Sequence, residues 1–106
     1  SQRRAIHMAA VFACNFTKHC YALAEKLLAA EGVPFEILLP LIDETARKVH
    51  TLPPLEAQTG PAIRYDENVI QKHLDTLSSE PEMQTLYRLM SQSIHEAAQE
   101  KSKGIE

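Results

Sequence analysis

Apolar residues recur at helical spacing from the start of the chain, and they predict a long opening helix. It begins at Ser1, which can cap it, and ends at about residue 30, before Gly32 and Pro34. One stripe of this helix is apolar along its length: Ile6, Ala9, Ala10, Ala13, Phe16, Cys20, Leu23 and Leu27. Further apolar residues lie on its other faces: Met8, Val11, Phe12 and Cys14. Because a helix that is apolar nearly all round is buried on several sides, we expect part of it to pack against another domain or subunit.

The rest of the pattern predicts three more helices, over about residues 35–50, 67–77 and 81–99. Pro40 lies inside the first of these runs, so it either kinks that helix or marks its real start. Asp66 has the side chain and position of an N-cap for the second.

The last helix is predicted to begin after a cap at Ser78 or Ser79. Its inward face follows from the helical period: Met83, Leu86, Tyr87, Met90, Ile94 and Ala97. The polar end of the chain after Gln99 is expected to fray.

No stretch alternates apolar and polar residues over the length of a β-strand, so the predicted fold class is all-α. A chain of 106 residues fits one domain. We therefore expect residues 1–106 to form a single helical bundle of about four to five helices around one long N-terminal helix.

Charge and composition narrow the function classes. The chain carries 11 Lys and Arg residues against 14 Asp and Glu, which gives a net charge of -3 at pH 7, so neither nucleic acid nor a membrane is an expected partner. Its 3 glycines cannot form a G-x-G-x-x-G or P-loop fingerprint, so no cofactor-binding residues are expected in this chain. There is no signal peptide and no long apolar run, and a cytoplasmic location is predicted.

The two cysteines, Cys14 and Cys20, fall on the same predicted helix. Six residues separate them by roughly 9 Å along the helix axis, whereas a disulfide needs Cα atoms within about 7 Å of each other. Both are therefore predicted to be reduced, buried thiols.

Two polar residues of the opening helix are candidates for chemistry. The histidines of the chain show no metal-ligand spacing, so no metal site is expected. His7 and Asn15, however, lie on the same broad side of the helix, about 12 Å apart along its axis. Asparagine is a poor residue for the middle of a helix, and a buried amide needs hydrogen-bond partners. Asn15 therefore either bonds to a neighbouring helix or faces a cleft.

Residues 59–66 form the least helical stretch of the chain, after a short helical turn expected at Pro53 and Pro54. Loops of this kind carry function more often than helix faces do. In one interpretation Thr59 Oγ1 and the Gly60 backbone contact a ligand and Arg64 clamps an anion. In the other, Gly60 only allows a tight turn and Arg64 is a surface salt-bridge partner.

Several segments resemble one family. Residues 2–16 resemble the opening of the uncharacterised helical domain that follows a Rossmann NADP-binding domain in a group of bacterial oxidoreductases. Residues 38–45 are similar to the second helix of that domain, residues 59–66 match its T-G-P-x-x-R-x-D element, and residues 86–88 resemble its last helix. The resemblance covers nearly the whole chain.

The resemblance implies that this chain is the C-terminal domain of a larger two-domain protein whose Rossmann domain lies outside it. The fold would be like the C-terminal domains of 6-phosphogluconate dehydrogenase, ketopantoate reductase and pyrroline-5-carboxylate reductase. In those relatives the first long helix borders the nicotinamide and often helps to form the dimer. The parent protein would be an NAD(P)-dependent oxidoreductase of a small carbonyl or imine substrate. NADP would be bound mainly by the missing domain, and none by this fragment alone.

The resemblance also implies roles for individual residues. Several relatives carry a Lys and an Asn four residues apart on the first helix, but here Val11 stands four residues before Asn15. Asn15 would orient the substrate, and His7 is the only obvious substitute for the missing proton-handling group. Thr59, Gly60 and Arg64 would line the cleft. The expected partners are the Rossmann domain and a second copy bound through the first helix. The alternative function is a non-catalytic helical interaction or dimerisation module.

Overall fold

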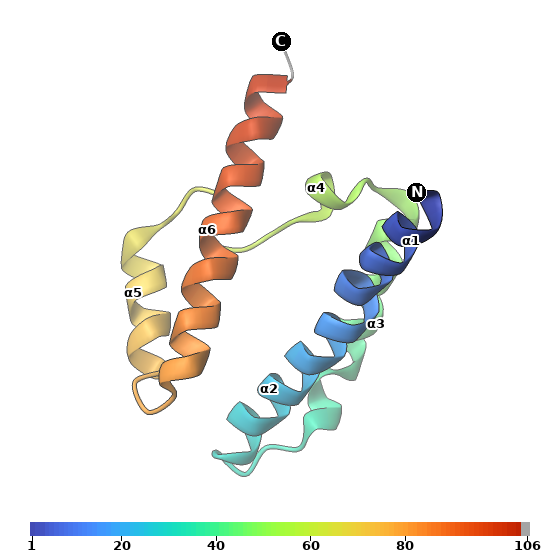
Figure 1. Ribbon diagram of the computed structural model, residues 1–106. Coiled ribbons are helices and arrows are strands. Elements are labelled where there is room, and N and C mark those ends of the chain that lie inside the picture. The colour runs from blue at the N-terminus through green and yellow to red at the C-terminus, as the bar shows by residue number, and fades with distance from the viewer. Residues whose placement is uncertain (105–106) are drawn as a thin grey trace. The chain divides into compact units, whose positions relative to one another are not determined.

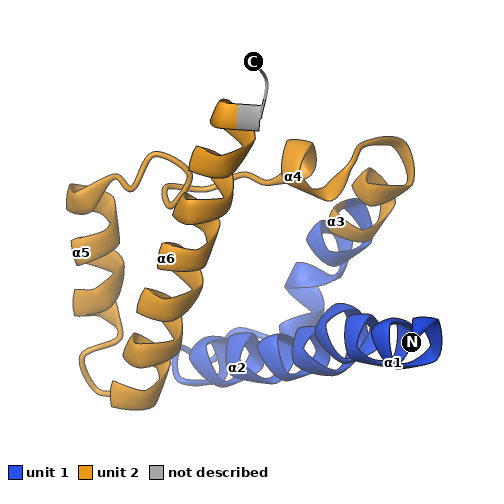
Figure 2. Ribbon diagram, turned by 45° about the horizontal axis from the view of Figure 1, so that its top comes forward, with its two compact units in different colours: residues 1–44 blue, residues 45–106 orange. Residues whose placement is uncertain are grey.

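The computed structural model describes residues 1–104, which form helices joined by turns (Figure 1). No β-strand occurs among these residues, so the predicted all-α fold class is confirmed. The chain divides into two compact units, Ser1–Glu44 and Thr45–Glu106 (Figure 2).

The long opening helix is present and continuous in the first unit. It consists of α1 (Gln2–Ala10), a π-helical segment η1 (Val11–Phe16) and α2 (Thr17–Ala29). Ser1 caps it as predicted, because its Oγ accepts a hydrogen bond from the backbone N of Arg4 at 3.4 Å. The helical period of the apolar residues does not indicate the π-helical segment.

The end of this helix confirms the prediction made from Gly32. Gly32 has a φ of 70°, and its N donates to Ala29 O at 3.1 Å while Val33 N donates to Leu28 O at 3.0 Å. These two bonds form a Schellman motif, which needs a residue in the left-handed region at the position of the glycine. The motif satisfies helix carbonyls that would otherwise have no partner.

The second predicted helix has two parts. A 3-10 segment, η2 (Phe35–Leu38), leads into α3 (Leu39–Thr51). Pro40 is the second residue of α3, where its missing N–H breaks no intrahelical bond, so this proline marks the start of the α-helix and does not kink it. Within the first unit, α2 packs on η2, and the rings of Tyr21 and Phe35 lie 6.4 Å apart.

The second unit contains α4 (Pro54–Ala57), α5 (Glu67–Thr76) and α6 (Pro81–Gly104). In both views α5 and α6 lie side by side (Figures 1 and 2). Their packing, together with the loop before α5, buries a small apolar core: Ala62, Ile70, Leu74, Leu77 and Met83. This core holds the only buried apolar side chains among residues 1–104.

Polar contacts join α5 to α6 beside this core. Gln84 Nε2 donates to the Leu74 carbonyl at 2.8 Å, and His73 Nδ1 lies 2.8 Å from the Tyr87 hydroxyl. The rings of His73 and Tyr87 meet edge to face at 5.7 Å. A side-chain bond to a backbone carbonyl fixes how far one helix can slide along the other, so these contacts hold the register of the pair.

Both ends of α6 differ from the prediction. Glu80, and neither of the two serines, holds the cap position, because its carbonyl accepts the first helical bond from Gln84 N at 3.0 Å. At the other end the helix continues past Gln99 to Gly104. Residues 105 and 106, for which fraying was also expected, lie outside the described residues.

The inward face of α6 is also partly wrong in the prediction. Leu86 is 45% exposed and Met90 is 56% exposed, whereas Ser91 is only 6% exposed. The less exposed side chains of this helix follow one another at intervals of four residues, from Met83 through Tyr87 to Ser91. The small side chain of Ser91 allows close packing on this face. A helical wheel based on hydrophobicity alone predicts that the larger Leu86 and Met90 are buried instead.

Candidate functional site

Asn15 lies in the π-helical segment of the opening helix. The helix widens there over six residues, and the Thr17 hydroxyl donates to Phe12 O, five residues back, at 3.3 Å. Single π-turns inside α-helices occur frequently at functional sites. The Asn15 side chain is exposed, and no hydrogen bond from residues 1–104 engages it. Of the two interpretations for this amide, a bond to a neighbouring helix is therefore absent from the described part of the chain.

His7 lies two turns earlier, in the last turn of α1, and its side chain is also exposed. A π-turn takes up more residues per turn than an α-turn, because its hydrogen bonds span five residues instead of four. The widened segment therefore rotates Asn15 back toward the side of the helix that carries His7. Their pairing in one site stays a prediction.

Several large apolar side chains of the opening helix remain exposed, because the rest of the described chain does not cover them. Ile6 is 69% exposed, Met8 55%, Phe12 63% and Phe16 51%. The rings of Phe12 and Phe16 meet each other edge to face at 5.0 Å. Large exposed apolar patches are typical of surfaces that bind another molecule or domain.

The two cysteines behave only partly as predicted. Cys14 and Cys20 are both free, as the helical spacing required. Both are exposed, so the prediction of buried thiols is wrong. The reason is that the described chain covers little of this helix, and apolar composition alone does not show which faces are covered.

The loop of residues 59–66 is a series of turns, as expected. Gly60 has a φ of 107°, a conformation that side chains rarely adopt, and Tyr65 has a φ of 51°. Asp66 caps α5 as predicted, with its Oδ1 accepting from Val69 N at 3.4 Å. Thr59, Gly60 and Arg64 are all exposed. The loop therefore displays these three residues at its surface, and their role in binding a ligand stays a prediction.

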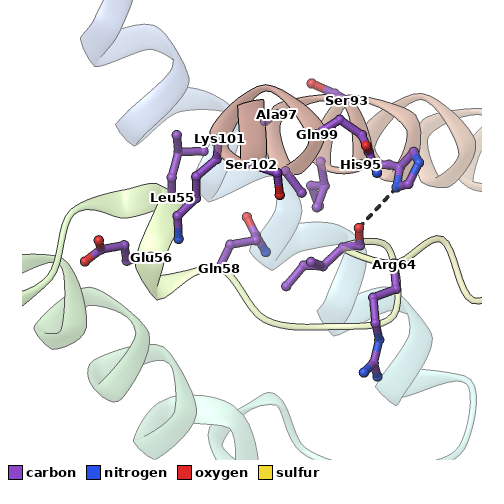
Figure 3. Close-up of a pocket in the computed structure, with 13 residues that line it drawn as sticks. Leu55, Glu56, Gln58, Arg64, Ser93, His95, Ala97, Gln99, Lys101 and Ser102 are labelled. Carbon is purple, nitrogen blue, oxygen red and sulfur yellow. Dashed lines mark hydrogen bonds between the residues drawn. The ribbon is translucent and has the colours of Figure 1, made fainter. Parts of the chain in front are cut away.

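The second unit contains a hollow of about 790 Å³ that α4, this loop and the end of α6 enclose (Figure 3). Of the three predicted loop residues, Arg64 lines it and Thr59 and Gly60 do not. Its other polar and charged lining residues are Glu56, Gln58, Ser93, His95, Gln99, Lys101 and Ser102. Its apolar lining residues are Leu55, Ile63, Ile94, Ala97 and Ala98.

His95 is the functional candidate that the sequence did not single out. Its Nδ1 lies 3.1 Å from the Ile63 carbonyl (Figure 3), and its ring lies 5.4 Å from that of Tyr65. A carbonyl oxygen only accepts hydrogen bonds, so Nδ1 must carry a proton. In the neutral ring, Nε2 is then the acceptor. The feature of the sequence that could have identified His95 is its position. His95 follows Ser91 by four residues and therefore lies on the same, less exposed face of α6.

Among residues 1–104, no three His, Cys, Asp or Glu side chains lie close enough together to hold a metal ion. None of the helices in this part of the chain combines the length and the hydropathy that a membrane crossing requires.

The comparisons with known proteins agree with the resemblance of the sequence. A solved structure named putative NADP oxidoreductase, from Bacteroides fragilis, is 65% identical to this chain, with a TM-score of 0.88. The match covers 90% of this chain and 37% of that protein, so the chain spans little more than a third of its length. A comparison with the curated proteins found no match. The family model described as Domain of unknown function (DUF2520) matches residues 1–94, and this chain belongs to that family.

Proposed function

We propose that this chain is the substrate-cleft and dimerisation domain of a cytoplasmic NADP-dependent oxidoreductase that acts on a small carbonyl or imine substrate. The observation that carries the proposal is the 65% identity, over 90% of the chain, to a protein named putative NADP oxidoreductase. The matched part is 37% of that protein, so the remainder has room for a Rossmann domain that binds the cofactor. The domain is inactive alone, because it lacks a glycine-rich phosphate-binding motif.

The open surface of the first helix supports the assignment of partners. Phe12 and Phe16 are more than half exposed, at 63% and 51%. Burial of one such side chain contributes roughly 1.5–3 kcal/mol, so an interface on this helix has a strong driving force. We assign the Rossmann domain of the parent protein and a second copy of this domain as the molecules that cover it.

The chemistry proposed for the first helix uses Asn15 and His7. The reduced nicotinamide, when bound, supplies a hydride to the carbonyl or imine carbon. Asn15 Nδ2 donates a hydrogen bond to the substrate heteroatom, which stabilises the negative charge that develops there. His7 would supply the proton that the reduced substrate takes up. Both side chains are exposed and therefore available to a substrate. Thr59, Gly60 and Arg64 are assigned to the substrate cleft.

The position of the cofactor can be tested before a substrate is known. In the intact parent protein, NADP⁺ should slow hydrogen exchange of the backbone amides of residues 7–16. Slowing that is confined to the Rossmann domain would contradict a cofactor at the first helix. Slowing at the helix upon dimerisation, without any effect of NADP⁺, would support the alternative of a non-catalytic interaction module.

The role of Asn15 has a separate test in the intact parent protein. Asn15→Ala should lower NADPH turnover by about 10²- to 10³-fold, the usual effect of removing one donor to a developing oxyanion. The circular dichroism spectrum and the melting temperature should stay unchanged, because the amide is exposed. Asn68→Ala removes an exposed amide from α5 and is the matched control. Equal turnover in the two variants would remove Asn15 from the site.

A further inference from the structure

The hollow of the second unit has the size and lining of a small-molecule site. Its volume of about 790 Å³ lies within the range of roughly 300–1,000 Å³ that is typical of ligand pockets. Apolar side chains from both sides line it, including Ile63 from the loop and Ile94 from α6. Polar and charged groups also line the same space, more of them than in most ligand pockets, and in such pockets polar groups fix the orientation of the ligand.

Lys101 is the positive group that faces this space. Its side chain is partly buried and extends from α6 toward α4 and Gln58 (Figure 3). Within residues 1–104, no carboxylate pairs with it. Glu56 also lines the hollow, but its carboxylate points outward, and the guanidinium of Arg64 runs away from α6 (Figure 3). The interior therefore presents one cation.

His95 supplies a fixed hydrogen-bonding group at the other side of the hollow. Its bond to the Ile63 carbonyl fixes the ring and leaves Nε2 without a partner in the described residues. The side-chain amide of Gln58 bonds to its neighbour Thr59 O at 3.0 Å through one of its two N–H groups. The other N–H of this amide is free to donate to a ligand.

We propose that this hollow binds a small organic acid, with its carboxylate on Lys101 and Gln58 and its apolar body against Ile63 and Ile94. A single inward cation suits a monoanionic carboxylate better than a phosphate, which carries more charge and is usually held by several donors. His95 Nε2 contacts a polar group at the far end of the ligand. This site lies wholly in the second unit and does not depend on the proposed role of the first helix, although Arg64, which is assigned above to the substrate cleft, also lines the hollow.

The test uses a pair of probes with the same body and different charge: 4-phenylbutanoate and 4-phenylbutanamide. Each is titrated into the intact parent protein with ¹³C-labelled isoleucine methyl groups. The carboxylate should shift the signals of Ile63 and Ile94 in a saturable way. The amide should bind about tenfold or more weakly, because it loses the charge-assisted bond. Equal binding of the two probes would overturn the proposal, as would the absence of any shift at these isoleucines.

Two lysines of the same helix provide matched variants. Lys101→Met keeps the length of the side chain and removes its charge, and it should weaken carboxylate binding by about ten- to a hundredfold. Lys103→Met is the control, because Lys103 is exposed and does not line the hollow. An equal loss in both variants would show only general charge attraction and would overturn the site. NADP⁺ affinity, measured in the same samples, reports separately on the proposed oxidoreductase function.

Discussion

The two units of this chain are stabilised in different ways. Every buried residue among the described ones belongs to the second unit, and none belongs to Ser1–Glu44. The second unit also has polar contacts between its helices, such as the Gln84 bond to Leu74 O at 2.8 Å. The first unit relies mainly on the backbone bonds of one long helix. Because most helix stability in proteins comes from tertiary packing, the second unit has an internal source of stability that the first unit lacks within the described residues.

The largest effect should come from the core of the second unit. Leu74 is 5% exposed, so Leu74→Ala should lower the free energy of unfolding by about 2–5 kcal/mol, as expected for a cavity in a packed core. Ile6 is 69% exposed, and Ile6→Ala should change the same quantity by about 0.5 kcal/mol or less in the 106-residue chain. Urea unfolding followed by circular dichroism measures both. Similar losses in the two variants would contradict the difference in packing between the two units.

The next effect should appear only when the parent protein is intact. Phe12→Ser removes an aromatic ring that is 63% exposed in this chain and, in our proposal, buried in an interface. Dimer dissociation should become about 10- to 100-fold easier, which corresponds to roughly 1.5–3 kcal/mol of lost burial. Light scattering over a dilution series measures this change, with Lys18→Ser on the same helix as control. An unchanged dimer would mean that Phe12 lies outside the interface.

The smallest effect is expected when one glycine of each unit is replaced by alanine and the loss of stability is compared. Gly60 has a φ of 107°, far from conformations that alanine adopts, and Gly60→Ala should cost about 1–3 kcal/mol. Gly32, with a φ of 70°, is in the left-handed helical region, where alanine costs only about 1–2 kcal/mol. In neither case would the added methyl group meet another atom within 4 Å, so backbone strain alone is measured. A larger loss at Gly32 in thermal unfolding would contradict this order.

The sequence predicted most features that depend on local chemistry, although the cap of α6 is Glu80 and not Ser78 or Ser79. Gly32 and Pro34 ended the first helix, Asp66 began α5, and Pro54 opened a short turn, because caps and helix breakers act within a few residues. The all-α fold class followed from the helical period alone.

Features that depend on packing could not be predicted in the same way. The exposure of Cys14 and Cys20, and the burial of Ser91 instead of Met90, depend on which faces other helices cover. The hollow could not be predicted either, because it brings Gln58 at the end of α4 and Ile63 of the loop against residues of α6 such as His95. His7, Asn15, Thr59, Gly60 and Arg64 stay predictions for the catalytic site and cleft.

The π-helical segment sets a constraint on any alignment or redesign of the opening helix. A helical wheel that uses one α-helical period for all of residues 2–29 places the side chains of half of the helix on the wrong faces. The reason is that the π-turn at Val11–Phe16 contains more backbone than an α-turn. Because a π-turn holds about one residue more than an α-turn, deleting one residue there would restore a uniform α-helix and leave α2 on its present faces. The same deletion inside α2 would rotate everything after it by about 100°. The contact of Tyr21 with Phe35 of η2 would therefore survive a deletion at Val11–Phe16, and this segment can lose a residue without redirecting the side chains beyond it.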